Sequence, residues 1–232
     1  MERMWGRELR RSKRRPGAPV HWRIVAFAVA VMGASLGYAA SLPQIDYAQV
    51  LASPRDAVRG QQLFVPCAAC HGANGGGSAD GLVPAIAGQH FQVLTRQLVD
   101  YRYSKRWDPR MESVAKGHLL PDAGAVAAVA AYVSSLPRPP VIGLGDGEHA
   151  VYGGQVYRRL CASCHGLAGQ GDASHGVPRV AGQHYAYLLR QLHDAVDDRR
   201  PNFSPEHVQL LKRFQYVEFV GVADYIARLG LQ

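Results

Sequence analysis

Two six-residue stretches contain all four cysteines of the chain. CAACHG stands at residues 67–72 and CASCHG at residues 161–166. Two cysteines three positions apart, near the end of a short helix, bring their thiols to one face, and the histidine that follows can turn its imidazole the same way. This Cys-x-x-Cys-His pattern is the one that attaches haem: the thiols add to two vinyl groups, and the histidine ligates the iron from one side.

Other chemistries also use CxxC pairs. Four cysteines could hold one structural zinc ion, but these pairs lie 94 residues apart and each carries its own histidine. A thioredoxin-like redox pair needs a βαβ context, which is missing here. We therefore predict two covalently attached c-type haems. The predicted attachment cysteines and proximal iron ligands are Cys67, Cys70 and His71 for one haem, and Cys161, Cys164 and His165 for the other.

The two motifs belong to a longer internal repeat. At the same offset of 94 residues, PAIAGQH at 84–90 pairs with PRVAGQH at 178–184. Further along, Tyr132 pairs with Tyr225 at an offset of 93, so the second unit has lost one net residue. A stretch rich in Pro and Gly at 135–154 separates the units, and it predicts an extended linker between two compact domains.

Apolar residues at helical spacing predict an all-α fold. The predicted helices cover residues 56–65, 90–103, 122–136, 184–197 and 215–229. Gly-rich loops follow each CxxCH motif, and no alternating strand pattern of useful length is present. The predicted domains are 1–39 for an export signal or membrane anchor, 40–140 for the first helical domain and 141–232 for the second.

Most of the charge lies at the start of the chain. The formal net charge is +8, of which residues 1–39 contribute +6 and the other 193 residues only +2. The body therefore lacks the electrostatic footprint of a nucleic-acid-binding protein. An apolar run at 24–40 follows the basic leader, which is typical of a cleaved export signal or of an uncleaved membrane anchor. Either one places the body outside the cytoplasm, where free thiols tend to oxidise.

The repeated motifs resemble those of class I c-type cytochromes, and their duplication resembles the two-haem cytochrome c-four family. The resemblance rests on the two CxxCH motifs, the two P-x-x-A-G-Q-H stretches and the terminal AAYVSSL and ADYIARL, and it covers about residues 55–232. It implies two tandem cytochrome c domains with one haem each, which shuttle single electrons outside the cytoplasm. It also implies that the loops at Pro84 and Pro178 accept a hydrogen bond from the proximal histidines.

Met111 is the only methionine outside residues 1–39. It lies 40 residues after His71, where class I cytochromes place their distal methionine. Although most methionines are core residues, its place between a loop and the last helix of the first unit favours ligation. We predict Met111 as the distal ligand of the first haem, because His/Met ligation is common in this class and raises the reduction potential.

The second haem has no methionine of its own, because none follows Met111. By the repeat offset the equivalent slot falls at Ser204-Pro205, and the nearest strong ligand is His207, which we predict as the distal ligand. The alternative ligands are His175, His193 and a deprotonated Lys212. A further alternative is an open site that binds small molecules. A His/His haem would have a lower potential than a His/Met haem, so electrons would flow from the second haem to the first.

Three further pairs of residues recur in both units. They are His90 and His184, Arg106 and Arg200, and Tyr132 and Tyr225. The histidines stand at predicted helix starts and suit a surface or capping role better than iron binding. The arginines suit either haem propionates or ordinary solvation. The tyrosines are predicted core aromatics that pack the last helix against the haem-bearing helix.

These features and the resemblance together predict a periplasmic di-haem cytochrome that transfers single electrons between redox proteins. Its partners would include a respiratory oxidase, a reductase or a periplasmic dehydrogenase. One alternative is a haem enzyme or ligand-binding protein with an open distal site on the second haem. Another is an electron-transfer subunit of a membrane redox complex, anchored through residues 24–40. The architecture favours a carrier over an enzyme, and no acid–base pair in the sequence stands out as catalytic.

Overall fold

The protein was studied as a computed structural model, which describes residues 44–140 and 143–229. Ten helices form within these residues, and the only β-structure among them is an isolated bridge between Asp172 and Val177. The predicted all-α fold is therefore confirmed. The predicted export signal or anchor lies outside the described residues. Within them, no helix has the length and hydropathy needed to cross a bilayer.

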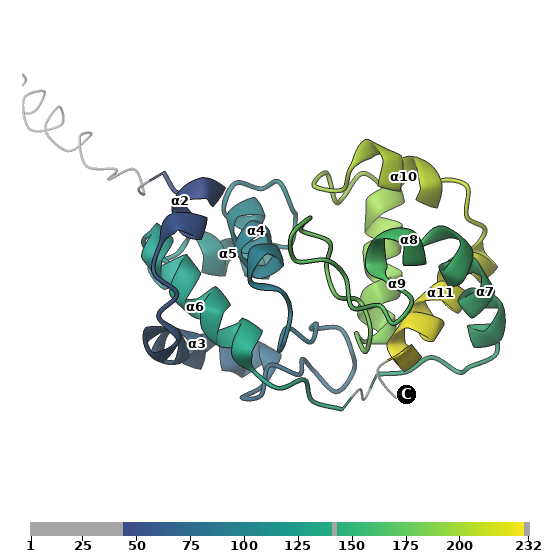
Figure 1. Ribbon diagram of the computed structural model, residues 1–232, viewed down its shortest axis with the longest axis horizontal. Helices are drawn as coiled ribbons and strands as arrows, with labels where there is room; N and C mark the ends of the chain where they lie inside the picture. The colour runs from purple at the N-terminus through teal and green to yellow at the C-terminus, as the bar shows by residue number, and fades with distance from the viewer. Residues whose placement is uncertain (1–43, 141–142, 230–232) are drawn as a thin grey trace, which may run out of the picture. The chain divides into compact units, whose positions relative to one another are not determined.

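The helices fall into two sets that follow each other along the chain (Figure 1). The first set is α2 (Tyr47–Ala52), α3 (Ala57–His71), α4 (Phe91–Arg102), α5 (Pro109–Lys116) and α6 (Ala123–Ser135). The second set is α7 (Ala150–Leu160), α8 (Ala162–His165), α9 (Tyr185–Val196), α10 (Pro205–Leu211) and α11 (Tyr216–Arg228). Each set builds its own apolar core, so the two are separate packing units, called the first and second domain below.

The predicted helix before the first CxxCH motif was too short. Asp56 caps α3 by accepting a hydrogen bond from the Arg59 N–H at 2.9 Å, and the helix then continues through Cys67 and Cys70 to His71. It runs past Pro66, although proline inside a helix is costly. The residues on either side, Leu63, Phe64 and Cys67, pack in the core. The other four predicted helices match α4, α6, α9 and α11 to within one residue at each end.

Two short helices, α5 and α10, stand where the sequence analysis predicted no helix. Asp108 caps α5 and Ser204 caps α10, and in both cases proline occupies the next position. A capping side chain followed by proline is a standard start signal, because proline fixes φ at a helical value and its missing N–H has no partner in the first turn anyway. The signal was present in Asp108-Pro109 and Ser204-Pro205, but both helices are too short to show a clear apolar period.

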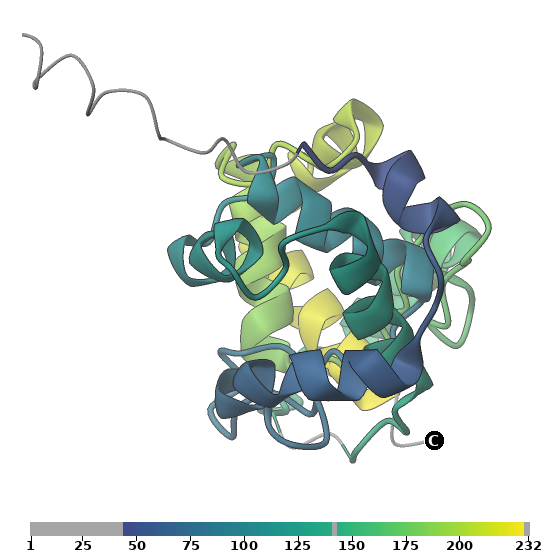
Figure 2. The same cartoon turned by 90° about the vertical axis from the view of Figure 1, so that its left-hand side faces the viewer.

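The core of each domain is a close crossing between its first long helix and its last. Helix α3 packs on α6, and α7 packs on α11; Figure 2 shows α3 in dark blue lying across α6 in teal. Gly60 and Gly153 stand at these crossings, where a Cβ atom would collide with the carbonyl oxygens of Ala128 and Gly221. The predicted tyrosines pack here as expected: Tyr132 lies 5.4 Å from Phe64 between ring centres.

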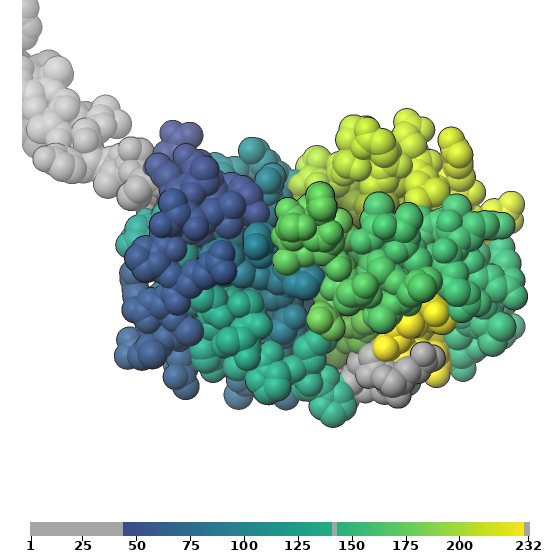
Figure 3. All heavy atoms as spheres, viewed as in Figure 1, coloured from purple at the N-terminus to yellow at the C-terminus, as the bar shows by residue number. Residues whose placement is uncertain are grey.

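The predicted linker at 135–154 differs from the observed segment. Helix α6 continues to Ser135 and α7 begins at Ala150, so the connection is shorter, and some of its described residues are bound to the second domain. The buried carboxylate of Asp224 accepts hydrogen bonds from the N–H groups of Gly145 (3.0 Å) and Gly147 (2.8 Å). On the face drawn in Figure 3, side chains of the two domains meet along a seam.

The glycine at the α3–α6 crossing gives a first test. Gly60→Ala is expected to destabilise the haem-loaded protein by about 1–3 kcal/mol, because the added methyl group forces two helix backbones apart. Without that clash, alanine in a helix would be favoured by up to ~1 kcal/mol. Gly124→Ala on α6 is the matched control, because its methyl group meets only the ends of the Arg59 and Asp122 side chains. Denaturant unfolding measures both; a Gly60→Ala variant as stable as Gly124→Ala would contradict the close crossing.

Candidate haem sites

The first CxxCH motif forms the last turn of α3. Cys67 is half-buried, Cys70 is exposed and His71 is only 7% exposed. Gly72 ends the helix with a φ of 75°, a left-handed conformation that glycine adopts without steric cost. The chain therefore turns away directly after His71, and the two thiols and the imidazole remain on the wall of one cavity.

The second CxxCH motif ends in the same way but is less regular. Cys161 is the C-cap of α7, and the rest of the motif forms the short helix α8, which Gly166 ends with a φ of 80°. Burial raises the pKa of the Cys161 thiol to about 11 and also raises that of Cys67, so an unattached thiol here would remain protonated. None of the four cysteines is in a disulfide.

The histidines of both motifs are held through Nδ1. The distance from His71 Nδ1 to the carbonyl oxygen of Pro84 is 3.0 Å, and that from His165 Nδ1 to the carbonyl oxygen of Pro178 is 3.1 Å. Burial lowers the pKa of both imidazoles, so the rings are neutral near pH 7 and Nδ1–H donates to the carbonyl. Nε2 is then left unprotonated, which is the state that a metal-ligating histidine needs.

Both histidines line a single large cavity of about 1610 Å³. Pockets for one small molecule usually measure about 300–1,000 Å³, so this space exceeds what one cofactor normally takes. Apolar side chains from both domains form much of its wall; they include Leu94, Leu98, Val129, Leu188, Leu192 and Ile226. The size and lining suit two large, flat, mostly apolar groups.

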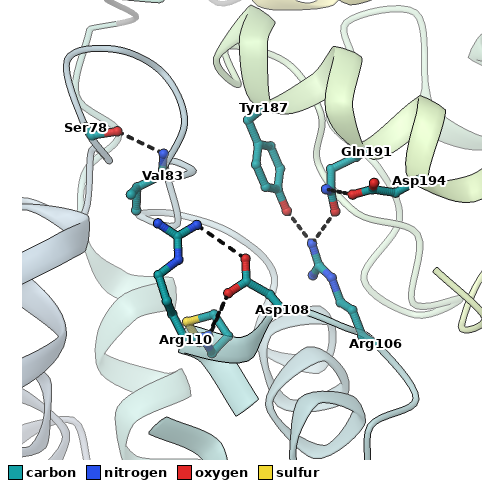
Figure 4. A network of polar contacts seen from close by, with 9 residues as sticks. Ser78, Val83, Arg106, Asp108, Arg110, Tyr187, Gln191 and Asp194 are labelled. Atoms are coloured by element: carbon teal, nitrogen blue, oxygen red, sulfur yellow. Dashed lines mark hydrogen bonds and ion pairs between the residues drawn. The ribbon is translucent and has the colours of Figure 1, made fainter. Parts of the chain in front are cut away.

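Met111 lines the same cavity as His71. It stands in the first turn of α5, where the Asp108 carboxylate accepts hydrogen bonds from the N–H groups of Arg110 (3.1 Å) and Met111 (3.2 Å). Figure 4 shows Asp108 with Arg110, whose guanidinium lies 3.5 Å from the carboxylate. The cap fixes the backbone of this turn, so the position from which Met111 projects is well defined.

His207 faces His165 across the part of the cavity in the second domain. Their ring centres are 6.2 Å apart, and Phe203 packs edge-on against His207 at 4.6 Å between ring centres. Two imidazoles that share a metal need roughly this separation, because each metal–nitrogen bond is about 2.0–2.1 Å long. Burial, with the nearby His165 and Arg200, lowers the pKa of His207 to about 4, so this ring is also neutral near pH 7.

Met111 and His207 occupy the same position in equivalent helices. Counting from the caps Asp108 and Ser204, each is the third helical residue, and each donates its backbone N–H to the cap side chain. The slot predicted from the repeat offset, at Ser204-Pro205, therefore falls two or three residues before the equivalent position. The loop before α10 is two residues longer than its counterpart before α5, and only the helix cap reveals the correct alignment.

The other nitrogen ligands considered from the sequence are placed differently. His175 reaches the rim of the cavity, but its side chain is 78% exposed and its Nδ1 bonds to Asp172 at 2.7 Å. His193 stacks on Phe219 with 4.8 Å between ring centres and is absent from the cavity wall. Lys212 is exposed and also lies outside the wall.

Two arginines meet between the domains. Arg106 is 6% exposed and donates to three neutral side chains, those of Gln97, Tyr187 and Gln191. Figure 4 shows its bonds to Tyr187 and Gln191. Arg200 lies against the ring of Phe203, and its buried Nε has no hydrogen-bond partner among the described residues. Burial and the charge of Arg106 lower the pKa of Arg200 to about 9.

Buried cations are normally paired with anions. The unpartnered Nε of Arg200 therefore fits an anionic group that the protein chain does not supply, and the propionate carboxylates of haem have the right chemistry. Of the two roles left open from the sequence, ordinary solvation does not describe Arg106. The residues present thus suit haem at both its apolar and its anionic parts.

The AGQH stretches have a role that the sequence did not predict. His90 and His184 hold the N-cap positions of α4 and α9, as expected, but neither side chain makes a capping hydrogen bond and His184 is 1% exposed. Instead, their Nε2 atoms bond to carbonyl oxygens of the opposite domain, those of Gln170 (2.8 Å) and Gly76 (2.6 Å). The sequence signal for this role was the recurrence of Gln-His in both units, at 89–90 and 183–184.

The sequence of this chain matches those of known proteins. A family model for cytochrome c matches residues 57–137 and again 150–218. Cytochrome c4 from Pseudomonas aeruginosa is 34% identical over 184 residues, which cover 75% of this chain and 89% of that protein. A thiosulfate dehydrogenase electron acceptor from Stutzerimonas stutzeri is 30% identical over 222 residues, covering 91% of this chain and 96% of that protein.

Solved structures with a similar fold point to the same family as these relatives. Reduced recombinant cytochrome c4 from Pseudomonas stutzeri has a TM-score of 0.67 at 26% identity, covering 75% of this chain and 98% of that one. Cytochrome c4 from Acidithiobacillus ferrooxidans has a TM-score of 0.61 at 28% identity, and the match covers 69% of this chain and 97% of that one. The chain therefore belongs to the cytochrome c family. Within it, this is a two-haem class I cytochrome that resembles cytochrome c4, binds two covalent c-type haems and transfers electrons.

The two attachment motifs can be tested separately. A Cys67→Ala/Cys70→Ala variant and a Cys161→Ala/Cys164→Ala variant are each expected to retain one covalent haem per chain, because each motif supplies both thioether bonds to its own haem. Haem that remains with the protein after acid-acetone extraction measures this. Ser163→Ala, inside the second motif, is the control and should retain two. Two haems in either double variant would contradict the assignment.

Proposed function

We propose that the chain is a periplasmic electron carrier whose two haems would have different iron ligands. The proposed sets are His71 with Met111 for the first haem, attached at Cys67 and Cys70, and His165 with His207 for the second, attached at Cys161 and Cys164. The observation that carries this proposal is the shared helix position of Met111 and His207. The 6.2 Å between the rings of His165 and His207 supports the second set independently.

When bound, each haem supplies a one-electron change between ferrous and ferric iron. The chain's residues hold the ligands fixed during that change: the Pro84 and Pro178 carbonyls keep the proximal rings oriented and neutral, and the capped helices α5 and α10 fix the distal side. The mostly apolar wall of the cavity would limit the contact of the bound haems with water. The exposed Cys70 and Cys164 mark the edges at which partner proteins gain access to each haem.

Unequal ligands give the two haems unequal potentials. A thioether ligand favours ferrous iron and raises the reduction potential, whereas a second imidazole lowers it. Electrons would therefore enter at the second haem and leave from the first. The two sites share one cavity, with Arg106 and Arg200 between them, so the carboxylates of both haems would meet the same cationic surroundings.

The partners are redox proteins. Relatives named thiosulfate dehydrogenase electron acceptor and cytochrome bc1 complex cytochrome c subunit support this class of partner. For this chain we propose a periplasmic dehydrogenase or reductase as donor and a respiratory oxidase as acceptor, with no nucleic-acid partner. We also propose that residues 1–39 direct export or anchor the chain, and that the domains divide at residue 140, inside the connection between α6 and α7.

Met111 can be tested by absorption and by potential. In the oxidised protein, Met111→Ala is expected to abolish the weak near-infrared band of thioether ligation to ferric iron and to lower the potential of the first haem, because the ligand that favours ferrous iron is gone. Val114→Ala, one turn further along α5 and also in the cavity wall, should retain the band. A band that persists in Met111→Ala would contradict this assignment.

His207 is tested by electron paramagnetic resonance of the oxidised protein. A low-spin bis-histidine signal is expected in the native protein, and it should disappear in His207→Ala, whose second haem becomes high-spin and binds carbon monoxide. His193→Ala, which removes a histidine packed on Phe219, should leave the signal intact. His207→Met should raise the potential of the second haem toward that of the first. A high-spin signal in the native protein, with one of the two haems binding carbon monoxide, would favour ligand chemistry instead.

A further inference from the structure

Two glutamines reach across the domain boundary in a reciprocal pattern. Gln183 of the second domain donates from Nε2 to the carbonyl oxygen of Ala85 (2.7 Å) and accepts from the Ala85 N–H (2.9 Å). Gln89 of the first domain makes the same pair of hydrogen bonds to Arg179, at 2.8 Å and 3.0 Å. Each side-chain amide thus binds both backbone groups of one residue in the opposite domain.

The residues that these glutamines bind directly follow the carbonyl groups that hold the proximal histidines. Because a peptide unit is planar and conjugated, the Ala85 N–H and the Pro84 C=O belong to one rigid group. A continuous chain of hydrogen bonds therefore runs from Gln183 Oε1 through this peptide to His71 Nδ1. In the other half, the same chain runs from Gln89 Oε1 through the Pro178–Arg179 peptide to His165 Nδ1.

Linked hydrogen bonds strengthen one another. An acceptor on the N–H of an amide polarises that amide, so its C=O becomes a better acceptor. A better acceptor on Nδ1–H gives the imidazole more electron density and makes it a stronger iron ligand. Gln183 is only 8% exposed, and water competes little for its amide. Its hydrogen bond to the Ala85 N–H therefore acts on His71 at full strength.

We propose that Gln183 and Gln89 are positioning residues that act crosswise: Gln183 sets the proximal-ligand strength of the first haem, and Gln89 sets that of the second. This inference rests on the proposed assignment of His71 and His165 as proximal ligands, but not on the distal ligands. Each domain thereby controls the potential of the haem in the other, so the two potentials depend on the docking of the domains.

The matched pair of variants is Gln183→Leu and Gln89→Leu in the full haem-loaded chain. Leucine fills similar space but neither donates nor accepts. Gln183→Leu is expected to raise the potential of the first haem only, and Gln89→Leu that of the second only, because a weaker proximal ligand stabilises ferric iron less. The change in each equilibrium constant for reduction should be about three- to tenfold, and tenfold corresponds to about 59 mV for one electron.

The signals of the two haems are assigned with the variants that lack one CxxCH motif, so the assignment does not depend on Met111 or His207. A second readout is the exchange of the proximal Nδ1–H with solvent, followed by proton nuclear magnetic resonance. It should become faster at His71 in Gln183→Leu and at His165 in Gln89→Leu. Arg138→Ala removes another hydrogen bond across the boundary, to the Ala181 carbonyl at 2.7 Å, and should leave both readouts unchanged.

Several results would overturn the inference. Equal shifts of both haems in either variant would indicate general loosening of the boundary, as would shifts of the same size in Arg138→Ala. A shift confined to the haem of the mutated domain, or no shift at all, would also contradict it. Failure of the proposed function would appear differently, as two haems retained by the variants that lack one CxxCH motif.

Discussion

A buried histidine that ligates iron must leave Nε2 bare while its other nitrogen stays paired inside the protein. Most of the local structure around each CxxCH motif follows from this constraint. A glycine with positive φ ends the helix directly after the histidine, and the loop that follows returns to place a proline carbonyl beside Nδ1. The same loop is tied to the histidine backbone: Gly77 N–H donates to the His71 carbonyl and Gly171 N–H to the His165 carbonyl, both at 2.8 Å. The imidazole ring and the backbone of each histidine are thus held by the same loop.

The proximal side is repeated in both domains, whereas the proposed distal ligands differ. The close helix crossings at Gly60 and Gly153 fix the core of each domain through backbone contact. Helices α5 and α10, which carry the proposed distal ligands, lie outside those crossings. Each of the two is fixed by its own cap. The residue in the third position can therefore be methionine in one domain and histidine in the other without a change in the core, so the duplicated fold holds two chemically different sites.

The residues proposed to attach and ligate haem on the proximal side could be recognised in the sequence, because they lie in short contiguous motifs. The CxxCH motifs, the proximal histidines and the long helices α4, α6, α9 and α11 all have local signals. The position equivalent to Met111 could not be counted correctly, because a longer loop before α10 shifts the register and only the caps Asp108 and Ser204 restore it. The contacts of Gln89 and Gln183 were not predictable, since they join segments 90 and 98 residues apart. The docked connection was missed because Asp224, which holds it, lies far away on α11.

The contacts across the domain boundary come in equivalent pairs. Gln89 and His90 form hydrogen bonds to carbonyl oxygens of the second domain, and Gln183 and His184 form the equivalent bonds to the first. Surfaces that contact each other through the same residues on both sides form an isologous interface, the kind found in two-fold symmetric dimers. A single domain of this kind therefore carries a surface complementary to its own copy. A tandem chain follows from such a dimer when a short peptide joins its two subunits, after which each half is free to diverge in sequence while the symmetric contact is preserved.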